Sequence, residues 1–393
     1  MANANGSSEL VGLHNVSADL LQKKCPMMWD LAQPCDLSFM ADLISGGDAA
    51  ILAQVRRIHN SMAGVDDDFL DRLSMNRSVG DGAFYTIIIL YAHLICFGAI
   101  GNGLVVLAVL RKATMKTARN MFILNLAVSD LLLCLVTSPL TLVEILSRYW
   151  PLGAGTDFLC KLFGGLEAVS VFVSSMSITA IALDRYQVIV YPTRQSLQLA
   201  EVCIILGCVW SLATLLASPM FVVRELEHHA INETVVGLPD TFDYCVESWG
   251  VERGRAYYSV FSMICQYVLP IVTVSVAYAG ITRKLRFRMS SLANRTSSLR
   301  ESREQRARRT HTLLVAIALI YAISWIPLNI CNLVSDFVSF RDMEQMRVVY
   351  AVCHMIGMSS ACSNPILYGW LNDNFRKEFV DILQRATPCL PPC

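Results

Sequence analysis

The sequence predicts an all-α membrane protein: a seven-transmembrane helix bundle with an interfacial eighth helix. Three observations lead to this fold class. Of the 393 residues, 54% are hydrophobic and only 16% are charged, whereas roughly 25% of the residues in soluble domains are charged. Seven long apolar segments follow one another along the chain. Lys and Arg gather in connections that would lie on one side of a membrane.

The composition also excludes several classes of protein. The formal net charge is zero, so nothing favours a nucleic-acid partner. The 14 cysteines include no CxxC pairs with the spacing of a zinc site. We find no HExxH or GxSxG motif and no pair of catalytic carboxylates on a helix, so we do not expect an enzyme.

Residues 1–83 are polar and irregular, and we expect them to form a mobile extracellular tail. Residues 1–14 have neither a basic leader nor an apolar core, so we expect no cleaved signal peptide. Cys25 and Cys35 either close a small loop or stay free. Asn-x-Ser/Thr triplets outside the cell are glycosylation acceptors. Four asparagines are candidates: Asn5, Asn15, Asn76 and Asn232.

The seven apolar segments predict a helix bundle over residues 84–370. Each segment exceeds the ~20 residues that a helix needs to cross the hydrocarbon layer. Only helices or closed barrels satisfy their backbone groups in lipid, and these segments are too long and continuous for barrel strands. The segments are approximately 84–110, 120–146, 157–190, 201–223, 255–285, 307–337 and 343–370.

Basic residues in the short connections predict which ends of the helices face the cytoplasm. The first connection carries Arg111, Lys112, Lys116 and Arg119, and the fifth is rich in Arg between residues 283 and 309. The fourth connection, residues 224–254, is acidic on balance and should face outward. We therefore predict a multi-pass plasma-membrane protein with its N-terminus outside and its C-terminus in the cytoplasm.

Residues 371–393 predict a cytoplasmic amphipathic helix and a short tail. Four apolar residues fall on one face of that helix, namely Phe375, Phe379, Ile382 and Leu383. We expect this face to lie along the inner leaflet of the lipid bilayer. Cys389 and Cys393 follow the helix, and they are either palmitoylated or unmodified thiols.

Charged residues inside the apolar segments point to a switching function. Asp184, Arg185 and Tyr186 close the third segment, where a charge pair can hold in one conformation and release in another. Asp130 is a carboxylate in the middle of the second segment, and such a residue marks a functional site by default. Prolines that remove a backbone hydrogen bond allow three helices to kink. They are Pro270, Pro327 and Pro365.

The segments carry further motifs in a fixed order. They are Gly101-Asn102, Asn125-Leu-Ala-Val-Ser-Asp130, Cys160, Asp184-Arg-Tyr186, Trp210, Pro270 with Tyr278, Trp325-Ile-Pro327 and Asn364-Pro-Ile-Leu-Tyr368. With this order, the chain resembles the rhodopsin-like (class A) family of G-protein-coupled receptors over nearly all of residues 84–383.

This resemblance implies several roles. A disulfide would join Cys160 to Cys245, and a sodium ion would lie in a polar cluster around Asp130. Ser174, Asn364 and Asn102 are candidate partners of Asp130 in that cluster, whose alternative role is a structural hydrogen-bond network; we expect no other cofactor. The residues implied in switching and G-protein coupling are Asp184, Arg185, Tyr186, Tyr278, Trp325, Pro327, Asn364, Pro365 and Tyr368.

A narrower resemblance is to receptors for neuropeptide Y and neuropeptide F. It is carried by Ser147-Arg-Tyr-Trp-Pro-Leu-Gly153 and Asp184-Arg-Tyr-Gln-Val-Ile-Val-Tyr-Pro192. Five pocket positions, counted from the helix motifs, also match: Thr141, Gln266, Asn332, Asp336 and His354. The resemblance implies an amidated, arginine-containing peptide. Asp336 would bind a guanidinium group, and Thr141 and His354 would meet a terminal amide.

Three positions depart from the pattern. Glu167 replaces a Gln of vertebrate relatives, and Glu144 replaces an aromatic residue. Both add negative charge to the pocket, so either the ligand presents a second cation or Glu167 is protonated. Ala307 stands where an acidic residue often clamps Arg185. The restraint on Arg185 must then come mainly from Asp184, with His311 or Thr310 as further candidates, and we predict ligand-independent signalling.

These observations predict a receptor that couples peptide binding to a G protein. The resemblance implies an inhibitory G protein that lowers cyclic AMP. One alternative is a receptor for another amidated neuropeptide. A second is an ion-coupled transporter using Asp130, for which internal repeats and paired broken helices would be expected; we find neither in the sequence.

Overall fold

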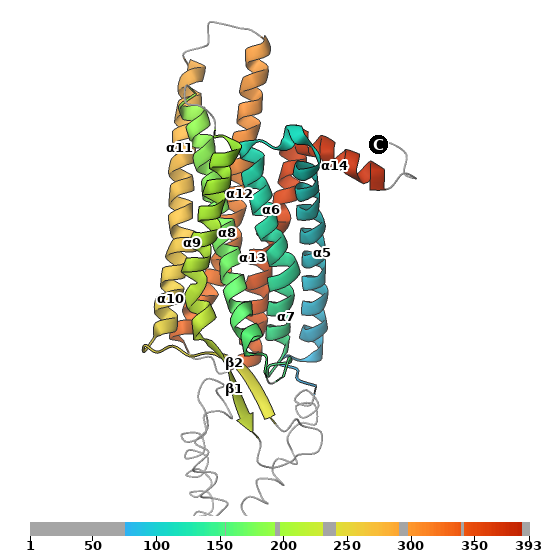
Figure 1. Ribbon diagram of the computed structural model, residues 1–393, viewed down its shortest axis with the longest axis vertical. Coiled ribbons are helices and arrows are strands. Elements are labelled where there is room, and N and C mark those ends of the chain that lie inside the picture. The colour runs from blue at the N-terminus through green and yellow to red at the C-terminus, as the bar shows by residue number, and fades with distance from the viewer. Residues whose placement is uncertain are drawn as a thin grey trace, which may run out of the picture. The chain divides into compact units, whose positions relative to one another are not determined.

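The computed structural model describes residues 75–153, 155–192, 197–230, 241–290, 298–338 and 342–386. The chain forms two compact units, Asn76–Val338 with Arg347–Cys393, and Met1–Met75 with Ser339–Met346. The first unit holds every described helix and strand apart from the first residues of α13. In that unit the helices run alongside one another, with a β hairpin at one end and a short helix at the other (Figure 1).

The described helices agree closely with the seven predicted segments and the eighth helix. They are α5 (Asp81–Arg111), α6 (Ala118–Leu132), α7 (Ser138–Leu146), α8 (Asp157–Val190), α9 (Leu199–Val223), α10 (Gly254–Met263), α11 (Leu269–Ser290), α12 (Ser298–Phe337), α13 (Met343–Leu371) and α14 (Asp373–Ala386). A short 3-10 helix, η2 (Ala113–Met115), follows α5. Two of the predicted segments are therefore each divided into two α-helices.

A π-helical turn causes each division. Leu133–Thr137 (η3) joins α6 to α7, and Ile264–Val268 (η4) joins α10 to α11. A π turn disturbs the regular backbone ladder and is often found at functional sites. At the second turn, the carbonyl of Gln266 accepts hydrogen bonds from Ser175 Oγ at 2.6 Å and from the Tyr321 hydroxyl at 3.0 Å. The turn in the fifth segment is thereby tied to α8 and α12.

Local sequence explains where several helices begin. The Thr117 side chain caps α6 by accepting from the Asn120 backbone N–H. Gln198 and Glu201 form a reciprocal capping box at the start of α9. Pro139 lies just after η3 in the continuous helix Ala118–Leu146, where its missing N–H removes a helical hydrogen bond.

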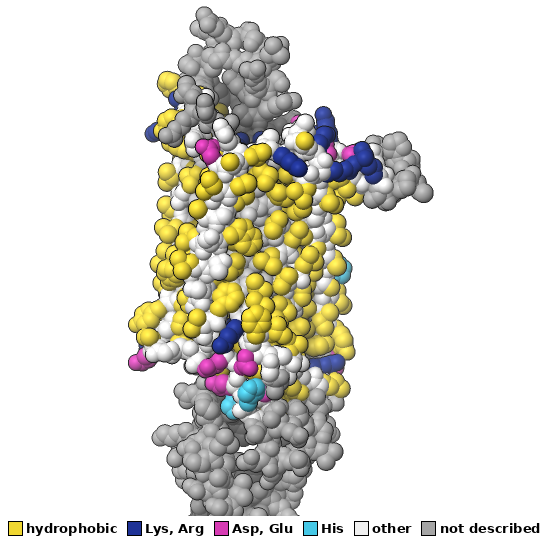
Figure 2. Space-filling model, in the orientation of Figure 1, with side chains coloured by type: hydrophobic (Ala, Val, Ile, Leu, Met, Phe, Trp, Pro, Cys, Tyr) yellow, Lys and Arg dark blue, Asp and Glu magenta, His cyan; other side chains and the backbone are white. Residues whose placement is uncertain are grey.

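Six stretches of the described chain are long and apolar enough to cross a membrane. They are Asp81–Arg111, Ala118–Leu146, Asp157–Val190, Leu199–Val223, Gly254–Phe287 and Val315–Phe337. The face in Figure 2 shows a broad band of hydrophobic side chains between the charged residues at the two ends. The seventh helix, α13, has 29 residues but is more polar, and His354, Ser360 and Asn364 from it are buried in the bundle.

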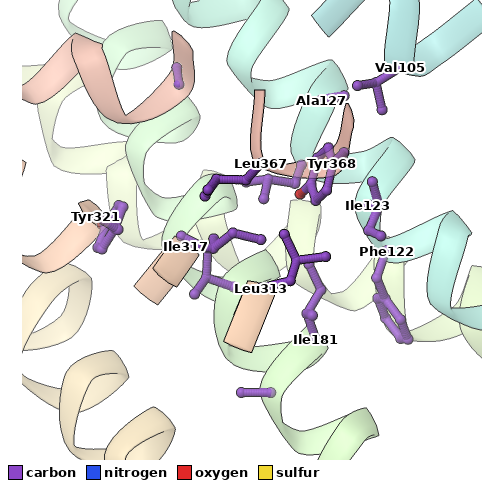
Figure 3. Close-up of a cluster of buried hydrophobic side chains, with 14 of the residues drawn as sticks. Val105, Phe122, Ile123, Ala127, Ile181, Leu313, Ile317, Tyr321, Leu367 and Tyr368 are labelled. Carbon is purple, nitrogen blue, oxygen red and sulfur yellow. The ribbon is translucent and has the colours of Figure 1, made fainter. Parts of the chain in front are cut away.

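The main hydrophobic core lies among α5, α6, α8, α11, α12 and α13, and Figure 3 shows a part of it. Phe122 and Ile123 of α6, Ile181 of α8 and Tyr368 of α13 are almost completely buried there. Close approach of helices depends on small residues. A Cβ atom on Gly101 would lie 2.9 Å from Cγ of Pro365, so the glycine lets α5 approach the proline of α13.

A β hairpin covers one end of the bundle, which the sequence did not predict. Strands β1 (Arg224–Ala230) and β2 (Thr241–Glu247) pair in antiparallel register, with Leu226 opposite Cys245. The Trp150 backbone N–H donates to the Asp243 carbonyl at 2.6 Å. Trp150 also packs with Phe163 and Leu226. These contacts attach the hairpin to one end of the helix bundle.

Helix α14 follows α13 at the opposite end and has the predicted amphipathic character. Phe375 is fully buried, and Phe379 and Ile382 pack against the main core, while half of Leu383 is exposed. Lys112 forms an ion pair with Glu378, and Arg111 lies 3.4 Å from Asp381. The apolar face and the ion pairs together hold α14 against the end of α5.

Candidate functional site

The predicted ligand residues come from every helix segment except the first and fourth. Thr141 and Glu144 lie on α7, Glu167 on α8, Gln266 in η4, Asn332 and Asp336 on α12, and His354 on α13. Several are in direct contact, and the contacts centre on the acidic side chains.

Glu167 lies at the centre of the first group. His354 Nε2 is 3.6 Å from Glu167 Oε1, and the Thr141 hydroxyl donates to Oε2 at 3.3 Å. On the other side of the imidazole, the Tyr91 hydroxyl is 2.9 Å from His354 Nδ1. If the tyrosine donates, the imidazole carries its proton on Nε2, facing Glu167. This group links α5, α7, α8 and α13.

Exposure shows which member of this group a ligand can reach. The side chain of Glu167 is 24% exposed, whereas that of His354 is 1% exposed. Thr141 is also buried, and its one hydroxyl proton is shared between Glu167 at 3.3 Å and the nearer Thr137 carbonyl at 2.9 Å. The sequence suggested that Thr141 and His354 meet the ligand directly. In the structure both side chains contact Glu167, so the Glu167 carboxylate is the group of this cluster that a ligand can reach.

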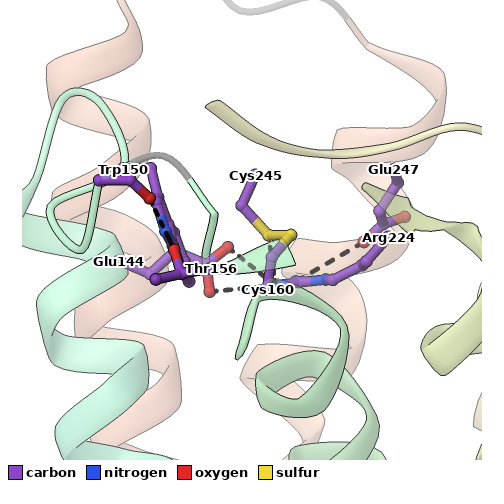
Figure 4. Close-up of a disulfide and its surroundings, with 8 residues drawn as sticks. Glu144, Trp150, Thr156, Cys160, Arg224, Cys245 and Glu247 are labelled. Atoms are coloured by element: carbon purple, nitrogen blue, oxygen red, sulfur yellow. Dashed lines mark hydrogen bonds and ion pairs between the residues drawn. A yellow bond between two sulfur atoms is a disulfide. The ribbon is translucent and has the colours of Figure 1, made fainter. Parts of the chain in front are cut away.

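Glu144 belongs to a second ionic group, at the base of the hairpin (Figure 4). Arg224 Nη1 lies 3.1 and 3.3 Å from the two oxygens of Glu144, and Nη2 lies 3.8 Å from Glu247. Burial alone would lower the pKa of Arg224, but Glu144 and Glu247 outweigh that effect and raise the pKa above its usual value. The negative charge of Glu144 is therefore already matched within the protein.

The disulfide between Cys160 and Cys245 confirms the predicted pair, with Cα atoms 5.7 Å apart. It joins the start of α8 to β2, beside the Arg224 group (Figure 4). The bond and the ion pairs thus hold the hairpin to α7 and α8 through two independent connections.

Arg347 is a structural residue that the sequence did not single out. Its Nη1 donates to the carbonyls of Ser147 at 2.7 Å and Ile145 at 3.2 Å. These are carbonyls at the end of α7, where the helix itself provides no donors. A basic residue near the start of the seventh segment was the signal that could have indicated this role.

Asp336 and Arg255 form a third ionic group, which the sequence also did not predict. Arg255 Nε lies 3.0 Å from Asp336 Oδ1 and 3.7 Å from Glu247 Oε2. The Asp336 side chain is only 1% exposed, whereas that of Arg255 is 58% exposed. No hydrogen bond from a described residue reaches either oxygen of Asp336. Among the described residues, the buried carboxylate is thus paired with one mostly exposed cation.

The remaining two ligand candidates lie near these groups along their helices. Asn332 is one turn before Asp336 on α12 and is partly buried. Gln266 is also partly buried, in the π turn whose carbonyl binds Ser175 and Tyr321.

Asp130 lies deeper in the bundle, in a small cavity lined also by Trp325, Tyr321 and Ser360. Asn364 Nδ2 donates to Oδ2 at 2.8 Å, and Ser174 Oγ donates to Oδ1 at 3.3 Å. A carboxylate and a hydroxyl beside a cavity are suitable oxygen ligands for a small hard cation. The donor atoms therefore fit the sodium ion that the resemblance implied.

Asn102 was expected to be a partner of Asp130, and this expectation is corrected. Its amide nitrogen donates to the carbonyls of Gly98 at 2.9 Å and Ala361 at 3.1 Å. Asn102 therefore joins α5 to the backbone of α13, and no described contact places it on the carboxylate. Pro365 has no N–H to donate to the Ala361 carbonyl four residues earlier, so this buried carbonyl is free to accept from Asn102.

Two tryptophans connect helices through their indole nitrogens. Trp325 Nε1 donates to Ser360 Oγ at 3.1 Å, which joins α12 to α13 beside the Asp130 cavity. Trp210 Nε1 donates to Asn125 Oδ1 at 2.8 Å, and Asn125 in turn donates to Ser177 Oγ at 2.7 Å. The second chain of bonds links α9, α6 and α8.

Near the C-terminal end of α8, Arg185 forms an ion pair with its neighbour Asp184, as expected. Both side chains are largely buried, at 12% and 4% exposed. The side chains of Ala307, Thr310 and His311 lie outside those that the structure describes. In the described residues, Asp184 is thus the acidic partner of Arg185.

The other predicted switch residues lie on several helices. Tyr186 packs edge-on against Tyr191, with ring centroids 6.1 Å apart. Tyr278 is buried, and Tyr368 stacks on Phe375 of α14 at 5.5 Å. Pro327 and Pro365 lie inside α12 and α13, where they remove helical hydrogen bonds.

Of the residues predicted to carry a glycan, a lipid or a second disulfide, only Asn76 lies within the described part of the chain. Asn5, Asn15, Asn232, Cys25, Cys35, Cys389 and Cys393 lie outside the described residues. Asn76 is partly buried, and its Nδ2 atom, which would carry a glycan, donates to the Tyr149 carbonyl at 2.9 Å. Its Oδ1 accepts from the Arg148 and Tyr149 N–H groups. In this structure Asn76 therefore holds the backbone at Arg148 and Tyr149, and its glycosylation stays a prediction.

Comparison with known proteins adds an independent line of evidence. The family described as "7 transmembrane receptor (rhodopsin family)" matches residues 101–368. A neuropeptide F receptor of Drosophila melanogaster is 54% identical over 327 residues, covering 82% of this chain and 67% of that protein. Putative neuropeptide Y receptor 11 of Caenorhabditis elegans is 34% identical over 322 residues, covering 77% and 76%. Human neuropeptide Y receptor type 2 is 35% identical over 300 residues, covering 75% of each chain.

Proposed function

Because this chain belongs to the rhodopsin family of seven-transmembrane receptors, we propose that it is a receptor for an amidated, arginine-containing neuropeptide of the F/Y type. The names of its relatives, a neuropeptide F receptor and neuropeptide Y receptors, support this ligand class. We also propose that it couples to an inhibitory G protein and lowers cyclic AMP.

The Asp336 carboxylate is the observation that carries the proposal. It is almost fully buried, and no described residue donates a hydrogen bond to either oxygen. A buried carboxylate in this condition is costly unless a donor is supplied. A guanidinium group offers two parallel N–H donors to a carboxylate and carries the opposite charge. An arginine of the ligand is therefore the partner that matches Asp336 best.

Glu167 supports an amidated C-terminus. A terminal amide is uncharged and presents N–H donors, which the partly exposed carboxylate can accept. A free C-terminal carboxylate would instead be repelled by Glu167 at short range. Glu144 does not require a second cation on the ligand, because Arg224 already pairs with it.

Signal transfer in this proposal runs from the hairpin end to the end that holds Arg185. A peptide bound between α8, α12 and α13 would bias their relative positions by its differential affinity for two conformations. The Trp325 to Ser360 bond and the Asp130 cavity lie on the path between the ends. Release of Arg185 from Asp184 would then expose a basic group to the G protein.

We propose that the receptor lies in the plasma membrane. In this orientation the hairpin is outside the cell and α14 is in the cytoplasm. Arg111, Lys112, Lys116 and Arg119 at the α14 end support it. Glycans on Asn5, Asn15 and Asn232, and palmitoyl groups on Cys389 and Cys393, belong to the same proposal. So does a sodium ion held by Asp130 and Ser174, with Asn364 orienting the carboxylate; bound there, it would neutralise a buried charge.

The experiment uses the full chain expressed in cultured cells. Amidated neuropeptides with and without arginine, and the same peptides as free acids, are tested for suppression of cyclic AMP. We expect response only to amidated peptides that contain arginine. Asp336→Asn should lower potency by roughly 30-fold or more, which corresponds to about 2 kcal/mol. Asp157→Asn, which removes an exposed carboxylate at the start of α8, is the matched control.

Two results would contradict this proposal. Equal potency of free-acid peptides would remove the assigned role of Glu167. An Asp336→Asn receptor with full potency would show that the peptide's arginine binds elsewhere. Response only to amidated peptides without arginine would favour the alternative of another amidated neuropeptide.

A further inference from the structure

Arg255 occupies the position at Asp336 that the proposed function assigns to the ligand. Its Nε atom is 3.0 Å from Asp336 Oδ1, and it is the only described cation paired with that carboxylate. We infer that Arg255 is an internal competitor of the peptide: it covers Asp336 in the free receptor and must be displaced by the guanidinium of the ligand. This inference rests on the proposed function.

Arg255 pairs with Asp336 through charge but without a hydrogen bond. Arg255 lies within ion-pair distance, yet neither oxygen of Asp336 receives a hydrogen bond from it or from any other described residue. A well-formed arginine–carboxylate pair has two aligned N–H donors. The present contact therefore provides charge but leaves the hydrogen-bonding capacity of the carboxylate unused. A ligand arginine that approaches end-on can supply both the positive charge and the two hydrogen bonds.

The exposure of the two partners indicates which of them moves. Asp336 is 1% exposed and lies on α12, whereas Arg255 is 58% exposed and lies in the first turn of α10. A long side chain that is mostly in solvent can leave with little loss of packing. The buried carboxylate cannot turn toward water as easily. Displacement should therefore consist of a swing of Arg255 with Asp336 staying in place.

Glu247 provides a second acceptor for the displaced side chain. Its Oε2 atom is already 3.7 Å from Arg255 Nε. Glu247 also lies 3.8 Å from Arg224 and accepts a hydrogen bond from Trp249 Nε1 at 3.0 Å, which hold it in place on β2. Arg255 can thus move from Asp336 to Glu247 without becoming an isolated cation. The hairpin, through Glu247, would then sense whether a peptide is bound.

This arrangement makes Arg255 a determinant of affinity and selectivity. Only a ligand that presents a cation to Asp336 has to displace Arg255. Only such a ligand should therefore bind with higher affinity when Arg255 is removed. A peptide in which that arginine is replaced by citrulline keeps the shape but has no charge, so its affinity should not depend on Arg255 in this way.

The test measures peptide affinity on membranes that contain the full-length receptor. Arg255→Gln should lower the Kd of an amidated arginine peptide about fivefold, the factor expected from loss of one ion pair whose cation is mostly exposed to solvent. Arg253→Gln is the matched control, because it removes an exposed positive charge two residues away and reports general electrostatic attraction. The gain should be absent for the citrulline peptide and absent in an Asp336→Asn background.

A measurement without peptide tests the resting contact separately. Thermal unfolding midpoints are compared for the purified wild-type receptor, Arg255→Gln, Asp336→Asn and the double variant. The two single changes should be non-additive, because each breaks the same pair. Additive effects, or an unchanged or weaker affinity of Arg255→Gln for the arginine peptide, would overturn the inference. Failure of the wild-type receptor to bind any arginine peptide would instead contradict the proposed function.

Discussion

Arg224 Nη1 lies 3.1 Å from Glu144 Oε1, so that the first residue of the β hairpin is tied to the last turn of α7. The two residues are 80 positions apart in sequence, and neither would be paired by local rules. The contact adds a charged connection beside the Cys160 to Cys245 disulfide.

Glu144→Ala should destabilise the receptor by about 1–2 kcal/mol. This is less than the roughly 3–5 kcal/mol for breaking a fully buried pair, because 37% of the Glu144 side chain is exposed and Glu247 remains near Arg224. The midpoint of thermal unfolding measures the effect. Glu225→Ala, an exposed glutamate on β1, should leave the midpoint nearly unchanged, and equal losses in both variants would contradict the prediction.

The hairpin should be more stable at acidic pH. His228 Nδ1 lies 2.6 Å from Asp243 Oδ1, and this hydrogen bond raises the pKa of His228 above its usual 6.5. A group whose pKa is raised on folding stabilises the structure fully below its unfolded pKa, and this contribution is lost as pH rises through the folded pKa. Protection of the hairpin amides from hydrogen exchange should therefore decrease from pH 6 to above pH 7, after correction for the intrinsic exchange rate.

A variant isolates the contribution of this pair. His228→Gln should remove the pH dependence of hairpin protection, whereas His229→Gln should retain it. An unchanged pH profile in His228→Gln would show that another group is responsible.

Sodium should lower the affinity of the receptor for an activating peptide. The Asp130 carboxylate and its neighbouring hydroxyl are suited to a small cation, and a cation bound only in the resting state favours that state. Replacing sodium by N-methylglucamine at constant ionic strength should raise agonist affinity several-fold, as measured by peptide binding. Asp130→Asn should abolish this response, and Asp157→Asn should preserve it. A sodium effect that persists in Asp130→Asn would place the cation elsewhere.

Gly165→Ala should destabilise the contact between α8 and α9. A Cβ atom at Gly165 would lie 2.2 Å from the ring of Phe221, so the ring must shift. Forcing atoms into a packed interior costs about 1–3 kcal/mol. Thermal unfolding of the purified receptor gives the measurement.

Gly207→Ala on α9 is the matched control for that change. No atom lies within 4 Å of the added Cβ, and alanine is favoured over glycine in a helix by about 1 kcal/mol. Its unfolding midpoint should stay level or rise. A Gly165→Ala receptor as stable as this control would mean that Phe221 moves without cost.

Much of the fold could be predicted from the sequence because it depends on local properties. Apolar length identified the helices, and the third segment matches α8 at both ends, Asp157–Val190. The spacing of Phe375, Phe379 and Ile382 identified the apolar face of α14, but this face packs against the protein core and not along the lipid as predicted. Motif order led to the family and to the disulfide that the structure contains. These features are encoded in short stretches and in their succession.

Side-chain partners were predicted less well, because they depend on how helices rotate and approach. Three basic residues, Arg224, Arg255 and Arg347, were not singled out, yet each contacts a group near the candidate pocket. Asn102 was a candidate partner of Asp130 but donates to the backbone carbonyls of Gly98 and Ala361. The hydrogen bonds from Asn76 to the backbone at Arg148 and Tyr149 were also not foreseen.

The sequence by itself determined the helices of this protein, their order and the acidic residues of its pocket, since hydropathy and motif spacing are properties of the chain alone. Only the tertiary structure decided how those acids are paired. Partners 80 residues apart, such as Glu144 and Arg224, meet because two π turns and a hairpin set the positions of the helix ends. Electrostatic pairing falls off over a few ångströms, so small rotations of helices decide which charges are matched and which acid is left for the ligand.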